Sequence, residues 1–319
     1  MIAALTVVFA AALELAIAEP PRRFHPVAGF GRLVAPLDRE WSRPRLVGSA
    51  VALGLPLAAA GIVAALVTAA GLLSPWLSAL LAGLVLFVTT SLRMLRDEAR
   101  ATIVATETDL DAARASLRAL AGRDASDLSA GEVRSAAVES VAENLADGLV
   151  APLGAVAVGV AAGTLVGGTT TALALGAAGA AWVKAVNTLD SMLGYRSKPV
   201  GWAPARLDDL VMWVPARVSA LLLAVVAVDV GALVRARSWL RGVPSPNSGW
   251  PMGTLAAVHD VRLVKPGVYE LDGGASLPDR AASERAIRTV AVAGVLAYLS
   301  TAVVVGVATG GVALSGVVA

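Results

Sequence analysis

Cysteine is absent from this chain, which excludes a disulfide framework and any metal site built on thiolates. Three common patterns are missing as well: the Gly-x-x-x-x-Gly-Lys-Ser/Thr phosphate loop, the His-Glu-x-x-His zinc helix and a complete Gly-x-Gly-x-x-Gly dinucleotide fingerprint. Gly29 and Gly31 begin the last of these, but Val34 stands where its third glycine would be. Any nucleotide site must therefore be built in an unconventional way.

Charge is scarce too. Only 16% of the 319 residues are charged, 57% are hydrophobic and the mean hydropathy is +0.73, whereas an ordinary soluble domain is about a quarter charged. The net charge of +2 is small and no basic tail is present, which argues against nucleic acid as a partner. This composition predicts an all-α, polytopic membrane protein in contact with a lipid bilayer.

Uncharged apolar runs long enough to cross a bilayer recur along the chain. We expect a single membrane domain over 1–319, with spans at about 1–18, 47–73, 75–92, 148–166, 169–185 and 289–310. The first run could instead be a signal peptide, but it lacks a basic start and contains Glu14. The uncharged C-terminal stretch fits either one span with a tail or two tight spans.

The distribution of arginine predicts the orientation of the chain, because cytoplasmic loops are enriched in Lys and Arg. The segments 19–46 and 93–134 are both rich in arginine, and we place both on the cytoplasmic side. We expect a polar helical insert at 93–147, in which Ser129 and Glu132 have the spacing of a capping box. Polar loop regions should follow at 184–217 and 235–288. The apolar run 218–228 is short for a span, which favours a re-entrant or surface-lying helix.

Four residues near the end of the polar insert form the first candidate cluster. Glu139, Glu143 and Asp147 recur every fourth residue, so on a helix they fall within an arc of roughly 80°, with Asn144 beside them. Three acids on one stripe repel one another and require a cation, a donor-rich partner or a raised pKa. Mg²⁺ with ATP phosphates would satisfy them. The alternative is a solvated helix face.

Lys184, Asn187 and Asp190 form a second cluster directly after an apolar run. Charged groups at bilayer depth are costly, so they usually face a polar cavity. A lysine that snorkels from a helix end is the alternative interpretation.

Further polar groups lie in loops and short helices. Ala205 to Asp209 should open a helix on which Arg206, Asp209, Trp213 and Arg217 share one face, and this set could bind a metal or phosphate or form a surface ion-pair network. The turn-forming stretch Ser245 to Pro251 could bind the polar edge of a ligand. His25 follows the first span, where an interfacial side chain is commoner than a base.

Taken together, these clusters resemble the adenosylcobinamide-phosphate synthase family of integral membrane enzymes in late cobalamin assembly. Order and spacing agree from His25 to Tyr269, although Val264-Lys265-Pro266 departs from the Gly-rich form expected there. The matching segments are His25-Pro26 to Arg32, Ala137 to Asp147 with Ala151-Pro152-Leu153, Ala185 to Tyr195, Gly201-Trp202 to Asp209, Pro215-Ala216-Arg217, Ser245 to Pro251 and Gly267-Val268-Tyr269.

The resemblance implies an ATP-dependent acid–amine ligase. Such an enzyme joins a propionate carboxylate of adenosylcobyric acid, a cobalt-containing corrinoid, to aminopropanol or its phosphate, with ATP as co-substrate and Mg²⁺ as the ion. We expect it in the cytoplasmic membrane with its active site facing the cytoplasm. Homo-oligomers and association with other membrane enzymes of cobalamin assembly both remain open.

The resemblance also implies roles for the clustered residues, provided that they meet in one pocket at the inner face of the bilayer. Glu139 would accept the proton of the amine. The residues expected to hold Mg²⁺ and the nucleotide phosphates are Glu143, Asp147, Asp190 and Asp208 or Asp209. Those expected to counter the transferred charge are Lys184, Arg206 and Arg217. The remaining substrate-binding residues are His25, Arg32, Asn144, Asn187, Tyr195, Lys198, Ser245, Asn247 and Trp250.

Two other classes of protein fit the same sequence. The clusters could hold a corrinoid without chemistry, as a membrane scaffold would, or the chain could be similar to the β-lactamase-regulatory inner-membrane proteins and serve signalling. A transporter fits less well, because no inverted repeat is evident.

Overall fold

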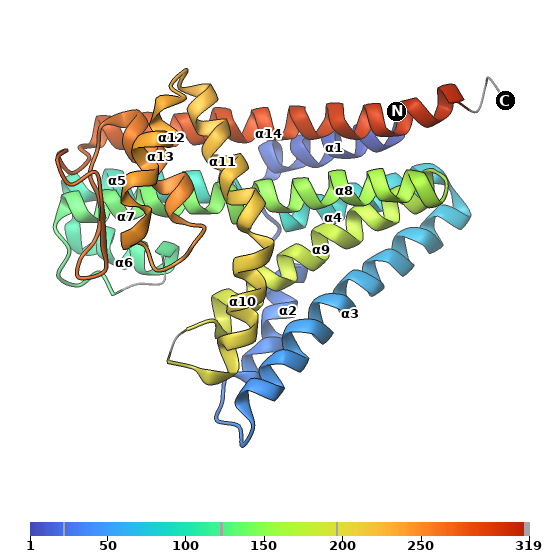
Figure 1. Cartoon of the computed structure of the whole chain (residues 1–319), viewed down its shortest axis with the longest axis horizontal. Coiled ribbons are helices and arrows are strands. Elements are labelled where there is room, and N and C mark those ends of the chain that lie inside the picture. The colour runs from blue at the N-terminus through green and yellow to red at the C-terminus, as the bar shows by residue number, and fades with distance from the viewer. Residues whose placement is uncertain (22, 122–123, 196, 316–319) are drawn as a thin grey trace. The chain divides into compact units, whose positions relative to one another are not determined.

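The computed structural model describes residues 1–319 except 22, 122–123, 196 and 316–319. Among the described residues the chain is helical throughout, apart from loops and one short β-hairpin, which confirms the predicted all-α membrane class (Figure 1). Three arginines of the segments considered above, Arg22, Arg123 and Arg196, lie outside the described residues. The chain divides into two compact units.

The first unit comprises Met1–Ser91, Ala151–Val211 and Ala297–Ala319. It includes the end of α14 (Arg280–Ser315), a helix that contributes to both units. Its other helices are α1 (Ile2–Ile17), α2 (Pro26–Val34), η1 (Ala35–Leu37), α3 (Pro44–Leu73), α4 (Pro75–Thr89), α8 (Ala151–Val166), α9 (Thr169–Leu193), η3 (Pro199–Gly201) and α10 (Trp202–Val211).

Local sequence explains where these helices begin. Pro44 and Pro75 occupy first helical positions, where the missing N–H would have no partner in any case. The Ser74 hydroxyl caps α4 by accepting a hydrogen bond from the Trp76 N–H at 3.2 Å. Along α3, large apolar side chains are exposed: Leu57 is 60% exposed and Ile62 is 61% exposed. In a bilayer these side chains contact lipid.

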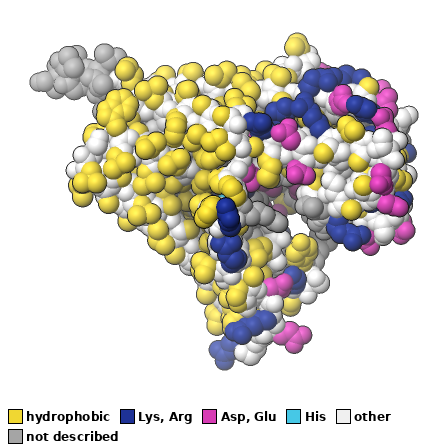
Figure 2. Space-filling model, turned by 180° about the vertical axis from the view of Figure 1, so that it is seen from behind, with side chains coloured by type: hydrophobic (Ala, Val, Ile, Leu, Met, Phe, Trp, Pro, Cys, Tyr) yellow, Lys and Arg dark blue, Asp and Glu magenta, His cyan; other side chains and the backbone are white. Residues whose placement is uncertain are grey.

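Five helices in the described part of the chain are long and apolar enough to cross a membrane: Pro44–Leu73, Pro75–Thr108, Ala130–Val166, Thr169–Leu193 and Arg280–Gly310. The chain is therefore a multi-pass membrane protein. Figure 2 shows a broad area of hydrophobic side chains on one face, with charged side chains gathered in other areas. The predicted spans lie in α1, α3, α4, α8, α9 and α14, while α1 has only 16 residues. The number of crossings stays a prediction.

Two glycines let the loop before α10 approach the long helices closely. A Cβ at Gly48 of α3 would lie 2.0 Å from the Val200 carbonyl oxygen, and one at Gly201 would lie 1.7 Å from the Leu193 carbonyl oxygen. Any side chain would push these segments apart. The glycines thus hold the start of α10 against α3 and α9.

The second unit comprises Leu92–Val150 and Met212–Leu296. The Ser129 hydroxyl accepts a hydrogen bond from the Glu132 N–H while the Glu132 carboxylate accepts one from the Ser129 N–H, so the predicted capping box is confirmed. The helices and strands are α5 (Arg93–Thr108), α6 (Leu110–Ala121), α7 (Ala130–Leu145), the π turn η2 (Ala146–Val150), α11 (Trp213–Val226), α12 (Gly231–Trp239), η4 (Leu240–Gly242), α13 (Gly249–His259), β1 (Leu263–Lys265) and β2 (Tyr269–Leu271).

Sequence analysis missed the β-hairpin, and it also missed helix α13, which lies in the region 235–288 that was expected to be loop. Strands β1 and β2 pair antiparallel with Leu263 opposite Leu271 and Lys265 opposite Tyr269. Pro266 and Gly267 form the turn, in which Gly267 has a φ of +71° and the Val268 N–H donates to the Lys265 carbonyl oxygen at 2.9 Å. Proline followed by glycine with positive φ is the pattern of a type II turn.

The helix expected to follow Ala205 is confirmed, but it ends earlier than predicted. Helix α10 ends at Val211 and α11 starts at Trp213. The face expected to carry Arg206, Asp209, Trp213 and Arg217 is therefore interrupted at Met212. The two helices are long enough to cross a membrane only as a broken pair, and such a pair can equally form a re-entrant loop.

Candidate functional site

A buried carboxylate ties α7 to the β-hairpin in the second unit. The Glu139 side chain is only 1% exposed. Its Oε1 accepts a hydrogen bond from the Ser135 hydroxyl at 2.8 Å, and its Oε2 accepts one from the Tyr269 hydroxyl at 2.6 Å. The Ser135 oxygen in turn accepts from the Val264 N–H at 2.8 Å. This network compensates the cost of burying the carboxylate and fixes the hairpin on the helix.

The network predicts that Tyr269→Phe destabilises the protein without changing its shape. Loss of the hydroxyl removes a hydrogen-bond donor from a buried carboxylate oxygen. This should lower the free energy of unfolding by about 1–3 kcal/mol. The midpoint of thermal unfolding in detergent measures the effect, with Tyr195→Phe as the matched control because Tyr195 is 53% exposed. Equal midpoints for the two variants would show that the Tyr269 hydroxyl does not hold the hairpin.

Glu143 lies further along α7 and Asp147 lies just beyond its end, and both are half-buried. The π turn η2 starts at Ala146, immediately before Asp147. Such turns widen the backbone locally and are frequent at functional sites. Asn144 lies beside them, and its side-chain NH₂ donates to the Ser140 carbonyl oxygen at 2.9 Å. The expected stripe of three equivalent acids is thus one buried acid and two accessible ones.

The donor chemistry of Glu143 and Asp147 fits Mg²⁺. That ion commonly binds one or two carboxylates together with water and the phosphates of a substrate. Within the part of the chain that the structure describes, no three His, Asp or Glu side chains form a ready-made metal site. The structure thus offers carboxylate pairs, and an ion held by one of them would take its other ligands from solvent or substrate.

Arg217 lies close to two indole rings in the second unit. Its guanidinium carbon lies 4.1 Å from the ring centroid of Trp213 and 5.3 Å from that of Trp250. Its Nη1 donates to the Trp213 carbonyl oxygen at 2.7 Å and to the Asn247 side-chain oxygen at 3.2 Å. Ser245 shapes this turn, because its hydroxyl oxygen accepts from the Asn247 N–H at 3.2 Å.

This arrangement brings together Arg217, Ser245, Asn247 and Trp250, all of which were predicted to bind substrate. Contacts with the two rings and the hydrogen bonds from Nη1 restrict the movement of the guanidinium. A guanidinium fixed in this way presents its remaining N–H groups as a fork that matches a carboxylate or a phosphate. Asn247 is 4% exposed and lines the buried side of the cluster. The cluster is therefore a candidate site for an anionic group.

A polar pocket of about 240 Å³ lies in the first unit. The His25 Nδ1 caps α2 by accepting from the Val27 N–H at 3.2 Å, and its Nε2 lies 3.7 Å from a Glu19 carboxylate oxygen. Burial lowers the pKa of His25, Glu19 opposes this shift, and the Lys184 ammonium adds to it. The residues lining the pocket are Glu19, His25, Val27, Ala28, Val88, Thr90, Ser91 and Lys184.

His25 and Lys184 were both predicted as site residues, and the structure places them at one pocket. Glu19 was missed. Because Nδ1 accepts a backbone hydrogen bond, the neutral imidazole carries its proton on Nε2, the atom that faces Glu19. The signal that could have found Glu19 is its position six residues before His25, at the end of the first apolar run.

Acidic residues of α9 and α10 form a third group. Asp190 is half-buried and lies within electrostatic range of Asp209. Asp209 pairs with Arg206 at 3.2 Å, and the Arg206 side chain is 68% exposed. Asp208 is 9% exposed. Asp209 is thus a like charge near Asp190.

Lys198 lines another groove of the first unit, and Tyr195 lies beside Lys198. The Lys198 ammonium donates to an Asp38 carboxylate oxygen at 2.7 Å and lies 4.8 Å from the centroid of the Tyr195 ring. The groove has a volume of about 430 Å³, and its other lining residues include Arg39 and Trp41. An exposed ion pair of this kind adds little stability. The groove offers charged and aromatic groups to a polar ligand.

The predicted site residues are divided between the two units. Glu139, Glu143, Asn144, Asp147, Arg217 and the 245–250 turn belong to the second unit, and the others belong to the first. Asn187 and Asp190 lie on the same helix as Lys184, and Arg32 is exposed at the end of α2. That all of them face one pocket stays a prediction.

His259, the second histidine, gives the stability of the protein an expected dependence on pH. Its Nε2 lies 2.9 Å from the Thr289 hydroxyl oxygen. Burial lowers the pKa of His259 to about 4, and the charges of Arg285 and Arg288 act in the same direction. The unfolded chain, with a histidine pKa near 6.5, binds more protons between these two values. Stability should therefore fall as the pH drops from about 6.5 towards about 4.

Unfolding midpoints at about pH 7.5 and about pH 5 check this expectation. The decrease in the unfolding midpoint between these two pH values should be smaller in His259→Gln than in the natural protein. Glutamine keeps a hydrogen-bonding group but does not titrate. An equal fall in both proteins would assign the pH dependence to other groups.

Comparisons with known proteins show the family of this chain. Residues 7–299 match the model of the CobD/Cbib protein family. A probable cobalamin biosynthesis protein CobD from Methanothermobacter thermautotrophicus is 32% identical over 276 residues, which cover 81% of this chain and 83% of that protein. The cobalamin biosynthesis protein CobD of Rhodobacter capsulatus is 35% identical over 82% of each chain.

The corresponding protein of Mycobacterium tuberculosis is 36% identical over 78% of this chain and 77% of its own length. No solved structure is detectably similar. The family match covers nearly the whole sequence, including the pocket of the first unit and the Glu139 and Arg217 clusters of the second. The chain therefore belongs to the CobD/CbiB family of cobalamin biosynthesis proteins.

Proposed function

We propose that this protein is an ATP-dependent ligase that forms an amide between adenosylcobyric acid and aminopropanol or aminopropanol phosphate. A propionate carboxylate oxygen attacks the terminal phosphorus of ATP and ADP leaves. The amine nitrogen then attacks the resulting acyl phosphate, the carbon–nitrogen bond forms, and inorganic phosphate and one proton leave. Activation is required because a carboxylate and an ammonium do not condense spontaneously in water.

The observation that carries this proposal is the Arg217 cluster in a chain of this family. A guanidinium in contact with Trp213 and Trp250 has the donor groups to bind a carboxylate or a phosphate, the two groups on which the reaction depends. Indole rings beside it can also pack on the corrin macrocycle. Glu143 and Asp147 supply the carboxylates that an Mg²⁺ ion bound to ATP would use.

Detergent-purified protein should be incubated with adenosylcobyric acid and with aminopropanol or its phosphate, with and without ATP and Mg²⁺. We expect the amide product and ADP to appear together, and only when both are added. Corrinoid binding without ATP consumption would instead make the protein a scaffold. Absence of corrinoid binding would favour a signalling relative.

A further inference from the structure

The polar pocket of the first unit carries groups of both charge signs. Glu19 supplies a carboxylate, Lys184 supplies an ammonium, and Thr90 and Ser91 supply hydroxyls. The His25 Nδ1 accepts a hydrogen bond from α2, and its Nε2 lies 3.7 Å from a Glu19 carboxylate oxygen, so the imidazole borders this carboxylate. A ligand that carries one positive and one negative group would find a partner for each.

The size of the pocket restricts the ligand. A volume of about 240 Å³ accommodates a molecule of a few heavy atoms and excludes a corrin macrocycle with its side chains. Among the reactants of the proposed ligation, the small amine is the one that fits. Aminopropanol carries an ammonium, and its phosphate ester carries an ammonium and a phosphate.

We infer that the polar pocket is the subsite for the small amine substrate, in which Glu19 binds its ammonium group and Lys184 binds its phosphate group when one is present. This inference rests on the proposed function. It adds Glu19 to the residues that recognise substrate and gives Lys184 the task of distinguishing the phosphate ester from the free alcohol.

The test measures binding of the amine itself, without the corrinoid. Titrations compare the affinities of aminopropanol phosphate, aminopropanol, which lacks the phosphate, and propan-2-yl phosphate, which lacks the ammonium. The comparison gives the contribution of each charged group to binding. In the natural protein, removal of either charged group should weaken binding by about tenfold, the effect of one charge-assisted hydrogen bond. Equal affinity for all three ligands would overturn the inference.

The variants then assign each end of the ligand to one residue. Glu19→Gln should bind aminopropanol phosphate and propan-2-yl phosphate with the same affinity, because the ammonium group no longer contributes. It should still bind aminopropanol phosphate more tightly than aminopropanol. Lys184→Met should show the reverse. Glu98→Gln is the matched control, because Glu98 is an exposed acid that lines neither the polar pocket nor the Lys198 groove. Should Glu19→Gln not fold, Glu19→Asp, which shortens the reach of the carboxylate, should weaken ammonium binding alone.

An aminophospholipid headgroup shares this chemistry, and an apolar groove of about 310 Å³ adjoins the pocket at Val27, Val88 and Lys184. The titrations are therefore repeated in micelles with phosphatidylethanolamine or phosphatidylcholine. We expect the same affinity in both. Competition by phosphatidylethanolamine would assign the pocket to lipid and overturn the inference. If the natural protein catalyses ligation but Glu19→Gln binds the amine as tightly as the natural protein does, the subsite is contradicted and the proposed function is not.

Discussion

Glu143→Gln is expected to lower the rate of amide formation by about 100-fold while the protein inserts and folds normally. Removal of groups that only support a metal ligand commonly costs 10- to 100-fold, so loss of a direct ligand should reach the upper end of that range. Glutamine keeps the size of the side chain, and Glu143 is half-buried, so packing should not suffer. Single-turnover formation of amide at saturating ATP measures the effect.

The matched control for this variant is Glu98→Gln. Glu98 is an exposed acid on α5 in the same unit, and its neutralisation should leave the rate unchanged. Raising the Mg²⁺ concentration should partly restore Glu143→Gln if the carboxylate holds the ion. A full ligation rate in Glu143→Gln would remove Glu143 from the proposed mechanism.

Arg217→Lys should lower kcat/KM for ligation by about 30-fold, equivalent to about 2 kcal/mol of charge-assisted hydrogen bonding. Lysine keeps the positive charge but cannot present a planar fork, and it stacks poorly between Trp213 and Trp250. The loss should appear mainly in KM, because the fork holds the substrate in its ground state as well as in the transition state.

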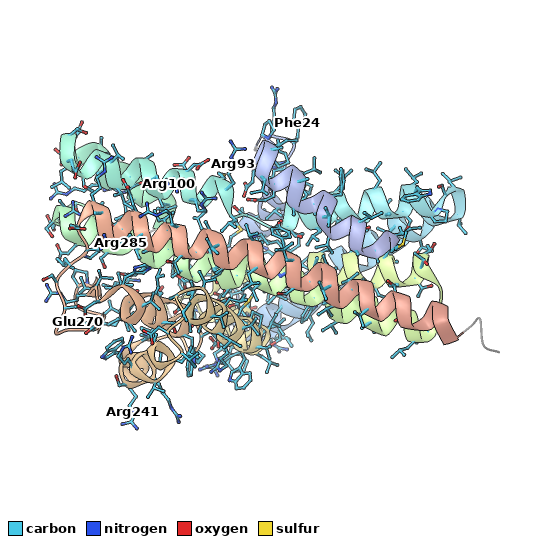
Figure 3. The ribbon with its side chains drawn as sticks, turned by 90° about the horizontal axis from the view of Figure 1, so that it is seen from above. Phe24, Arg93, Arg100, Arg241, Glu270 and Arg285 are labelled. Carbon is cyan, nitrogen blue, oxygen red and sulfur yellow. The ribbon has the colours of Figure 1, made fainter. Side chains whose placement is uncertain are left out.

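Arg241→Lys is the control for the guanidinium. Figure 3 shows Arg241 pointing away from the neighbouring helices, and the residue is exposed. Its replacement should leave both kinetic constants unchanged. Equal losses in Arg217→Lys and Arg241→Lys would mean that net charge, and not the fixed fork between two indoles, binds the substrate.

Much of the local structure could be predicted because it depends on neighbours in the sequence. The capping box at Ser129 and Glu132 uses residues three apart, and the turn at Ser245 is held by hydrogen bonds from the next few N–H groups. The hairpin was missed although Pro266 and Gly267 mark its turn. Strands of three residues are too short to show an alternating pattern.

The sequence by itself determined that this protein is a membrane protein, because its uncharged apolar segments are long enough to cross a bilayer and require lipid around them. It also determined which polar residues stand out, since charge in such a chain is costly. Tertiary structure alone decided how those residues are partnered. Tyr269 reaches Glu139 across 130 positions and Asn247 reaches Arg217 across 30. Such pairs depend on how helices and a hairpin pack, and packing is a property of surfaces that no local pattern contains.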